Sequence, residues 1–149
     1  MYIARKLDVA SVLKKKSCFL FGPRQCGKSS LVRETLPDAY MLDLLSGDTF
    51  TRLARNPNYI EEICCDNRPV VIDEIQKLPS LLDEVHRLIE TKGMRFLLTG
   101  SSARKLRKGG VNLLGGRARV RNLHPFSASE LGDAFDLDRA ITHGLVPGI

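Results

Sequence analysis

The stretch 21–30 constrains this chain most, because a short apolar strand there runs directly into a glycine-bounded loop and then into a helix. The loop reads G-x-x-x-x-G-K-S from Gly22 to Ser29, a spacing typical of phosphate-binding loops. Glycine at both ends lets the backbone curl so that its N–H groups point inward, and the N-terminus of the following helix adds positive potential. The sequence therefore predicts a site for a triphosphate.

Each polar residue of this loop has an expected role. Lys28 is expected to reach the β- and γ-phosphates as a point charge, and the Ser29 hydroxyl is expected to bind Mg²⁺. The nucleotide-binding residues predicted here are Gly22, Pro23, Arg24, Gln25, Cys26, Gly27, Lys28, Ser29 and Ser30. Cys26 also suggests the hypothesis that alkylation of its thiol would crowd the phosphates. A glycine turn with an incidental lysine is the simpler alternative.

A second candidate for the site is the pair Asp73-Glu74, which ends the β-branched run 70–72. Such a run predicts a buried strand with two carboxylates at its C-terminal tip. Asp73 is expected to hold Mg²⁺ through its water shell. Glu74 is expected to polarise a water for attack on the γ-phosphate, which favours hydrolysis over phosphoryl transfer to a small molecule. Two solvated acids that cap a strand end are the alternative interpretation.

Further candidate catalytic residues follow another apolar strand. Thr99 and Ser101 form its polar tip, where either hydroxyl is expected to hydrogen-bond the γ-phosphate or the water, although such a turn also needs no ligand to explain it. An arginine is usually needed to neutralise transition-state charge, in cis or from a partner. Arg24 and Arg117 are the candidates, and each is equally explained as a surface residue.

Strands alternate with helices along the whole chain. The sequence predicts strands at 17–21, 39–44, 70–72, 95–99 and 118–123, and helices at 7–16, 28–36, 49–55, 58–65, 79–92, 103–108, 127–131 and 136–143. A flexible link is expected at Gly109 and Gly110. This alternation predicts an α/β fold of three layers, in which helices flank a mostly parallel five-stranded sheet. Ligands of such sheets bind outside the C-terminal strand ends, so the candidate groups could meet in one crevice.

Composition limits the possible partners and surroundings. A chain of 149 residues with 43% hydrophobic residues can bury one real core, and it lacks the run of about 18 apolar residues that a membrane span requires. The net charge of +6 permits a nucleic-acid partner without requiring one. The four cysteines show no C-x-x-C pair, which predicts reduced, mostly buried thiols rather than a zinc site. A cytoplasmic location without membrane contact is expected.

Several of these segments together resemble a family of prokaryotic AAA-type ATPases. The segments that carry the resemblance are 22–29, 72–79, 97–103, 116–117 and 123–126. In that family the ATPase domain precedes a C-terminal domain of unknown function. The resemblance implies a P-loop NTPase fold that binds ATP with Mg²⁺ and hydrolyses it, with Lys28, Ser29, Asp73 and Glu74 carried over by position.

The chain departs from this pattern in its length. The family usually continues well beyond the Leu-His-Pro-Phe segment, whereas this chain ends at Ile149. We therefore expect an ATPase domain at 1–132 and the start of a truncated C-terminal region at 133–149. A missing domain or a neighbouring copy in a homo-oligomer would then supply any further arginine. The alternative function is a nucleotide-gated switch, or a module that binds DNA or protein, with little intrinsic hydrolysis.

Overall fold

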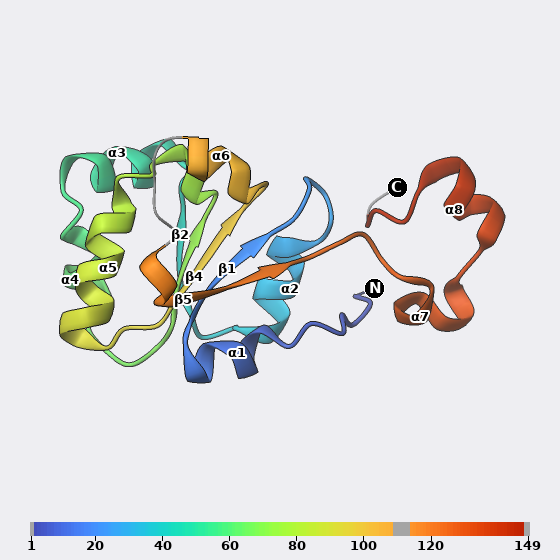
Figure 1. Cartoon of the computed structure of the whole chain (residues 1–149), viewed down its shortest axis with the longest axis horizontal. Helices are drawn as coiled ribbons and strands as arrows, with labels where there is room; N and C mark the ends of the chain where they lie inside the picture. The colour runs from blue at the N-terminus through green and yellow to red at the C-terminus, as the bar shows by residue number, and fades with distance from the viewer. Residues whose placement is uncertain (1, 109–113, 148–149) are drawn as a thin grey trace.

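A single five-stranded sheet forms the centre of the molecule. The computed structural model describes residues 2–108 and 114–147, so the link predicted at Gly109 and Gly110 lies outside the described residues. The strands are β1 (Ser17–Phe21), β2 (Tyr40–Asp43), β3 (Val70–Asp73), β4 (Phe96–Gly100) and β5 (Ala118–Asn122). They lie in the order β2-β3-β4-β1-β5, and every pair is parallel (Figure 1). The predicted α/β fold is confirmed, and the sheet is parallel throughout.

Helices occupy the connections between the strands. They are α1 (Val9–Lys15), α2 (Lys28–Thr35), α3 (Gly47–Arg55), α4 (Tyr59–Ile63), α5 (Leu81–Lys92), α6 (Ala103–Lys108), α7 (Ala128–Leu131) and α8 (Leu137–His143). Short 3₁₀ turns are η1 (Ile75–Lys77), η2 (Leu114–Gly116) and η3 (Gly132–Ala134). Helix α5 begins two residues later than expected, because Pro79 and Ser80 form a turn before it. Gly93 ends α5 with a left-handed φ of 63°, as its sequence predicts.

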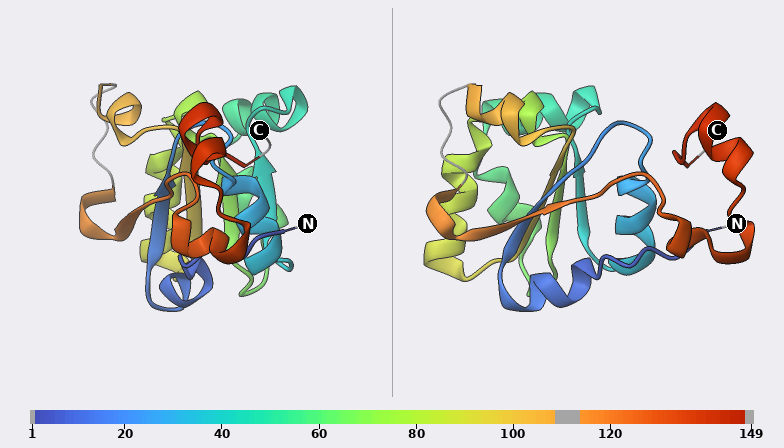
Figure 2. Two further views of the ribbon diagram at one scale, coloured as in Figure 1. Left: turned by 90° about the vertical axis from the view of Figure 1, so that its right-hand side faces the viewer. Right: turned by 45° about the vertical axis from the view of Figure 1, so that its right-hand side comes forward.

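The helices cover both faces of the sheet and bury two apolar clusters. Phe19 packs with buried residues of α3, α4 and α5 on one face. Leu20, its neighbour in β1, packs with buried residues of α1 and α2 on the other face. Figure 2 shows the sheet between these two layers of helices. All five residues of β1 are buried, as expected for a strand covered on both faces.

The last strand leads the chain away from this core. β5 forms one edge of the sheet, and its partly exposed residues explain the polar alternation of its sequence. Beyond it, α7 and α8 form an arm beside the N-terminal segment (Figures 1 and 2). The predicted capping box of Ser127 and Glu130 starts α7. No helix among the described residues has the length and apolar character needed to span a membrane.

Candidate nucleotide-binding site

The loop between β1 and α2 depends on glycine at its two ends for different reasons. Gly27 adopts a left-handed φ of 95°, and Gln25 adopts one of 64°. Gly22 needs no such freedom, but a Cβ there would overlap the backbone carbonyl oxygen of Leu123 and lie 2.8 Å from the Cys26 Sγ. The curl of the loop therefore comes from Gln25 and Gly27, whereas Gly22 allows the segment after β5 to approach closely.

Lys28 begins α2 and extends back beneath the loop. Its Nζ donates hydrogen bonds to the carbonyl oxygens of Gly22 at 2.6 Å and Pro23 at 3.0 Å. Only 8% of the residue is exposed. The loop thus holds the ammonium group with its own backbone, and the charge lies at the base of the predicted phosphate site.

Cys26 differs from its expected role. Its side chain is fully buried and packs in the apolar cluster with Leu20, Leu31 and Leu123, so the folded loop gives an alkylating reagent no access to the thiol. Easy alkylation of this thiol in the intact fold is therefore not expected, and the crowding of the phosphates by a modified thiol stays a prediction. The backbone of Cys26 remains part of the loop, because the loop turns between Gln25 and Gly27.

Asp73 and Thr99 meet at the C-terminal ends of neighbouring strands. The Thr99 hydroxyl donates a hydrogen bond to the Asp73 carboxylate and accepts one from the backbone N–H of Glu74 at 3.3 Å. Burial raises the pKa of Asp73, and the charges of Glu74 and Asp43 raise it further, although the Thr99 hydrogen bond and Lys28 oppose the shift. A carboxylate in this setting gains from a bound cation, because a cation offsets the cost of its burial.

Glu74 is held in an unusual backbone conformation directly after β3. Its φ is 61°, in the left-handed region that few residues other than glycine adopt. The Gln76 side-chain amide donates a hydrogen bond to the Glu74 carboxylate. The other amide atom, Gln76 Oε1, is buried without a partner among the described residues. Gln76 thus orients Glu74, a role that the sequence did not reveal because the contact depends on the local turn η1.

One pocket collects part of the predicted site. It has a volume of about 630 Å³, and its lining includes Lys28 and Glu74. The other residues around it are Arg24, Gln25, Gly27, Ser29, Ser30, Leu45 and Pro147. Ser101 and Pro23 line a different pocket, on the side of the loop that faces α6. The structure therefore brings Glu74 to the lysine but does not bring Ser101 into the same pocket.

Arg117 lies away from this pocket. It directly precedes β5, whose first residue, Ala118, pairs with Ser17 at the start of β1. The phosphate loop begins at the opposite end of β1, so the length of a strand separates it from Arg117. The Arg117 guanidinium instead donates to Glu90 of α5. Within one chain, the structure does not place Arg117 in the nucleotide site.

The expected Mg²⁺ ligands are hard oxygen atoms. The Ser29 hydroxyl is exposed in the pocket, and the Asp73 carboxylate has the raised pKa described above. Mg²⁺ prefers oxygen ligands and usually keeps several waters, so one hydroxyl and one carboxylate suit it. No group of three or more His, Cys, Asp or Glu side chains suited to a metal is found among the described residues. Ser29 lines the pocket and Asp73 does not, so the fit to magnesium rests on the oxygen chemistry of the two side chains.

Comparison with known proteins identifies the family. A family model described as an AAA domain matches residues 14–132, which is most of the chain. This chain belongs to the AAA domain family. No curated protein matches it.

Two solved structures resemble this AAA domain. PCH-2 from C. elegans is 22% identical over 76% of this chain and 36% of that chain, with a TM-score of 0.48. A Signal Transduction ATPase with Numerous Domains (STAND) protein with a tetratricopeptide repeat sensor, from Pyrococcus horikoshii, is 15% identical, with a TM-score of 0.54. The latter match covers 98% of this chain and 26% of that chain, and it supports the fold alone. The AAA domain thus spans about a third and about a quarter of these two proteins.

Arg5 of the AAA domain is a buried contact residue that sequence analysis missed. Its guanidinium donates to the carbonyl oxygen of Cys26 at 3.0 Å, to the carbonyl oxygen of His124 and to the carboxylate of Glu130. It also lies over the Phe126 ring, 4.4 Å from the centroid. Only 3% of the Arg5 side chain is exposed. Arg5 therefore joins the phosphate loop to the segment after β5 and to α7.

A second pocket of the AAA domain adjoins the phosphate pocket. Its volume is about 370 Å³, and it shares Gly27, Ser30 and Pro147 with the first pocket. The remaining lining residues are Tyr2, Ile3, Arg5, Arg33, Glu34 and Phe126. The two hollows thus meet at the start of α2, and Tyr2, Ile3 and Phe126 give the second one apolar surface beside its charged side chains.

Proposed function

We propose that this AAA domain binds ATP together with Mg²⁺ and hydrolyses it. The observation that carries this proposal is the shared pocket of Lys28 and Glu74, in which a phosphate-binding cation and a carboxylate face the same space. The loop backbone turns around this space at Gln25 and Gly27. A triphosphate bound there would lie between the group that neutralises its charge and the group that activates water.

The paired pockets suggest how the nucleotide would lie. The phosphates would occupy the pocket of Lys28, beside the N-terminus of α2, where helix N–H groups favour anions. The base would occupy the adjoining pocket, where Tyr2, Ile3 and Phe126 supply apolar surface. Gly27 and Ser30 would lie between the two parts, since both pockets include them.

Lys28 would exchange its partners on binding. In the structure its ammonium group satisfies the carbonyl oxygens of Gly22 and Pro23, and phosphate oxygens would compete for the same donors. Ser29 and Asp73 would hold the magnesium ion, which neutralises phosphate charge when bound. Thr99 would keep the Asp73 carboxylate turned toward the site, because its hydroxyl donates to that carboxylate.

Glu74 is the proposed general base. As water attacks the γ-phosphorus and the bond to the β-phosphate oxygen breaks, a proton of the water would pass to the Glu74 carboxylate. The hydrogen bond from Gln76 fixes the orientation of that carboxylate. The Thr99 hydroxyl also accepts a hydrogen bond from the backbone N–H of Glu74. One threonine thus positions both carboxylates of the site.

The alternative, a nucleotide-gated switch with little turnover, is supported by how few arginines of the described residues reach the phosphate pocket. Arg24 is the arginine that lines the phosphate pocket, and it is an exposed residue of the loop itself. Arg117 points to Glu90, so we propose that it acts in catalysis only on the nucleotide of a neighbouring copy. An isolated domain would then bind ATP well and hydrolyse it slowly.

Glu74→Gln distinguishes hydrolysis from switching. We expect phosphate release to fall by about 10²–10⁴-fold while the affinity for Mg-ATP is retained, because the amide cannot accept the proton. Glu62→Gln is the matched control, since Glu62 is an exposed acid on α4. Equal turnover in the wild type and in both variants would contradict the proposal. Tight ATP binding without turnover in the wild type would favour the switch.

The domain division and the location remain predictions. We propose that residues 1–132 form the ATPase domain and that 133–149 begin a further region, which fits the family match at 14–132. In the structure this last region contains α8 and contacts the rest through a hydrogen bond from Phe126 N–H to the Leu145 carbonyl oxygen. The four unpaired thiols suit a reducing compartment such as the cytoplasm.

A further inference from the structure

The segment 91–129 is strongly basic and contains no acidic residue. It holds nine Lys and Arg residues without a single Asp or Glu, although the whole chain has 17 acids. The structure folds this segment into β4, α6 and the edge strand β5. The net positive charge of the chain thus comes from this segment, although its Lys92 and Arg117 pair with Glu61 and Glu90.

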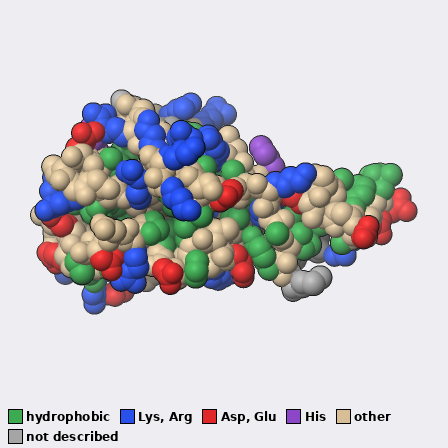
Figure 3. Space-filling view, turned by 90° about the horizontal axis from the view of Figure 1, so that it is seen from below, with side chains coloured by type: hydrophobic (Ala, Val, Ile, Leu, Met, Phe, Trp, Pro, Cys, Tyr) green, Lys and Arg blue, Asp and Glu red, His purple; other side chains and the backbone are tan. Residues whose placement is uncertain are grey.

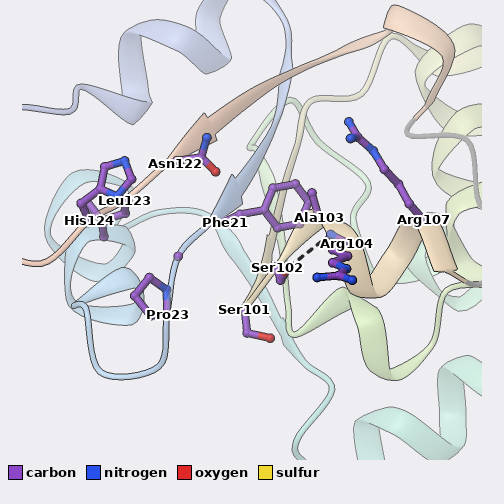
Figure 4. A pocket seen from close by; sticks show the side chains of 11 residues that line it. Phe21, Pro23, Ser101, Ser102, Ala103, Arg104, Arg107, Asn122, Leu123 and His124 are labelled. Atoms are coloured by element: carbon purple, nitrogen blue, oxygen red, sulfur yellow. Dashed lines mark hydrogen bonds between the residues drawn. The ribbon is translucent and has the colours of Figure 1, made fainter.

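A pocket opens within this basic region, beside the phosphate loop. Its volume is about 650 Å³, and it lies at the C-terminal ends of β1, β4 and β5. Arg104 and Arg107 approach it from α6, and Asn122 and His124 approach it from the end of β5, with Phe21 between them (Figure 4). These cationic and amide side chains can donate hydrogen bonds to an anion.

In the described part of the chain, two arginine side chains and one hydroxyl at this pocket lack protein partners, whereas the Ser102 hydroxyl accepts a hydrogen bond from the Arg104 N–H group. Among the described residues, neither Arg104 nor Arg107 forms an ion pair, whereas Arg87 and Arg117 both pair with acids on the other side of the domain. The Ser101 hydroxyl is buried at the pocket without a hydrogen-bond partner in the described part of the chain. A buried hydroxyl without a partner is costly, so this group also points to a ligand.

Two further basic side chains lie on β5, on the face opposite to that of Asn122, because side chains alternate along a strand. Arg119 and Arg121 lie on one face of this strand, near Cys18 of β1. Burial raises the pKa of the Cys18 thiol to about 11, and the positive charges of the two arginines oppose that rise. Figure 3 shows Lys and Arg side chains gathered in the upper half of the face seen from below. Positive charge therefore lies on both faces of the edge strand.

We propose that this pocket binds the phosphodiester backbone of a single-stranded nucleic acid. The unpaired guanidinium groups of Arg104 and Arg107 suit the phosphates of a polymer with one negative charge per residue. The volume of about 650 Å³ has room for part of an extended strand. The binding surface is distinct from the nucleotide pocket, because no residue lines both.

The two surfaces nevertheless share a wall. Gly22 and Pro23 line the basic pocket, and their carbonyl oxygens face the Lys28 ammonium group. A strand bound on one side would therefore act on the peptides that hold Lys28 on the other side. This part of the inference rests on the proposed function, and it makes nucleic-acid affinity and ATP affinity reciprocally coupled.

The test measures fluorescence anisotropy of a labelled oligo(dT) with the full chain at low and moderate salt. In the double variant Arg104→Ala/Arg107→Ala we expect the affinity to fall about tenfold or more. We also expect the slope of log affinity against log salt to become shallower by about 1.4, since each lost phosphate contact removes about 0.7. Arg52→Ala/Arg55→Ala is the matched control, because these exposed arginines lie on α3, beside the opposite edge strand.

Several outcomes would overturn the proposal: no oligo(dT) binding at low salt, equal loss in both double variants, tighter binding of a duplex, or equal competition by poly-glutamate. The last would indicate an acidic protein partner instead. Thermal unfolding checks that both variants fold. ATP binding is measured separately in each variant, so a failure of the proposed ATPase function remains distinguishable from a failure to bind nucleic acid.

Discussion

The Lys28 ammonium group lies 2.6 Å from the carbonyl oxygen of Gly22, six residues earlier in the chain. This contact closes the phosphate loop around its own cation, so the lysine serves the fold of the loop as well as the expected ligand. The same ammonium group also contacts Pro23, which ties it to the wall between the two pockets.

Lys28→Met tests this double role. We expect the affinity for Mg-ATP to fall by about 10- to 150-fold, because a hydrogen bond to a charged group contributes about 1.5–3 kcal/mol. Isothermal titration calorimetry measures the affinity. Lys77→Met is the control, since Lys77 is exposed in η1 outside the pocket. Unchanged ATP affinity in the Lys28 variant would remove the phosphate-binding role.

Asp73→Asn should separate stability from function. The folded chain raises the pKa of Asp73 above its ordinary value of 3.8, so the folded state binds this proton more readily than the unfolded state. The ionised carboxylate therefore disfavours folding increasingly as the pH rises through the folded pKa. We expect the variant to unfold at higher denaturant concentration than the wild type at neutral pH, and the difference to shrink as the pH falls toward 3.8.

The same variant should lose the effect of magnesium on nucleotide affinity, because an amide holds a cation poorly. Urea unfolding over a range of pH and ATP binding with and without Mg²⁺ are the two measurements. Asp38→Asn is the control at an exposed position. A variant that is less stable than the wild type at neutral pH would contradict the burial argument.

Arg5→Lys tests the link between the phosphate loop and α7. Lysine keeps the charge but cannot reach Cys26, His124 and Glu130 together with its single ammonium group. We expect the free energy of unfolding to fall by about 1–3 kcal/mol, measured by urea denaturation.

A double-mutant cycle with Glu130→Gln makes this prediction specific. Residues in direct contact usually show coupling energies of about 0.5–3 kcal/mol, so the two losses should not add. Arg33→Lys is the control, because Arg33 is exposed on α2. Simple additivity of the Arg5 and Glu130 effects would show that their contact contributes nothing to stability.

Gly22→Ala should destabilise the domain through a steric conflict with backbone. The added Cβ would overlap the Leu123 carbonyl oxygen, and relief requires the segment after β5 to move. Overpacking of this kind costs about 1–3 kcal/mol, observable as a lower midpoint in thermal or urea unfolding. Gly47→Ala is a sharp control, because a Cβ at Gly47 meets nothing within 4 Å and alanine favours the helix. Equal midpoints in the two variants would rule out the conflict.

Much of the fold could be predicted from local sequence pattern. The apolar run of β1 and the β-branched run of β3 indicate strands covered on both faces, and both are buried throughout their apolar part. Their alternation with helices indicates a parallel sheet, which the structure confirms. Helix ends marked by Gly93 and Ser127 were predicted for the same local reason, since a cap depends on residues only a few positions away.

The prediction of the site succeeded for residues that directly follow the C-terminal end of a strand. It failed where the direction of a strand or the path of a loop decides which side of the sheet a residue reaches. Glu74 reaches the pocket of Lys28 because both follow C-terminal strand ends. Arg117 precedes its strand, so a parallel β5 carries it to the opposite end of the sheet. The strand predicted at 118–123 already implied this position, because Arg117 lies before it and not after it. Ser101 lies at the C-terminal end of β4, as predicted. The path of the loop after β4 then places it in the pocket beside α6 and not in the pocket of Lys28.

By itself the sequence determined the phosphate loop, the paired carboxylates and the layered sheet, because each depends on residues that are close along the chain. The tertiary structure alone decided which of those groups share a pocket. Arg5 meets Glu130 across 125 positions and holds the loop at Cys26, and no local pattern predicts such a contact. Packing of the chain ends against the loop is a property of the whole fold, and it determines the walls of both pockets beside Lys28.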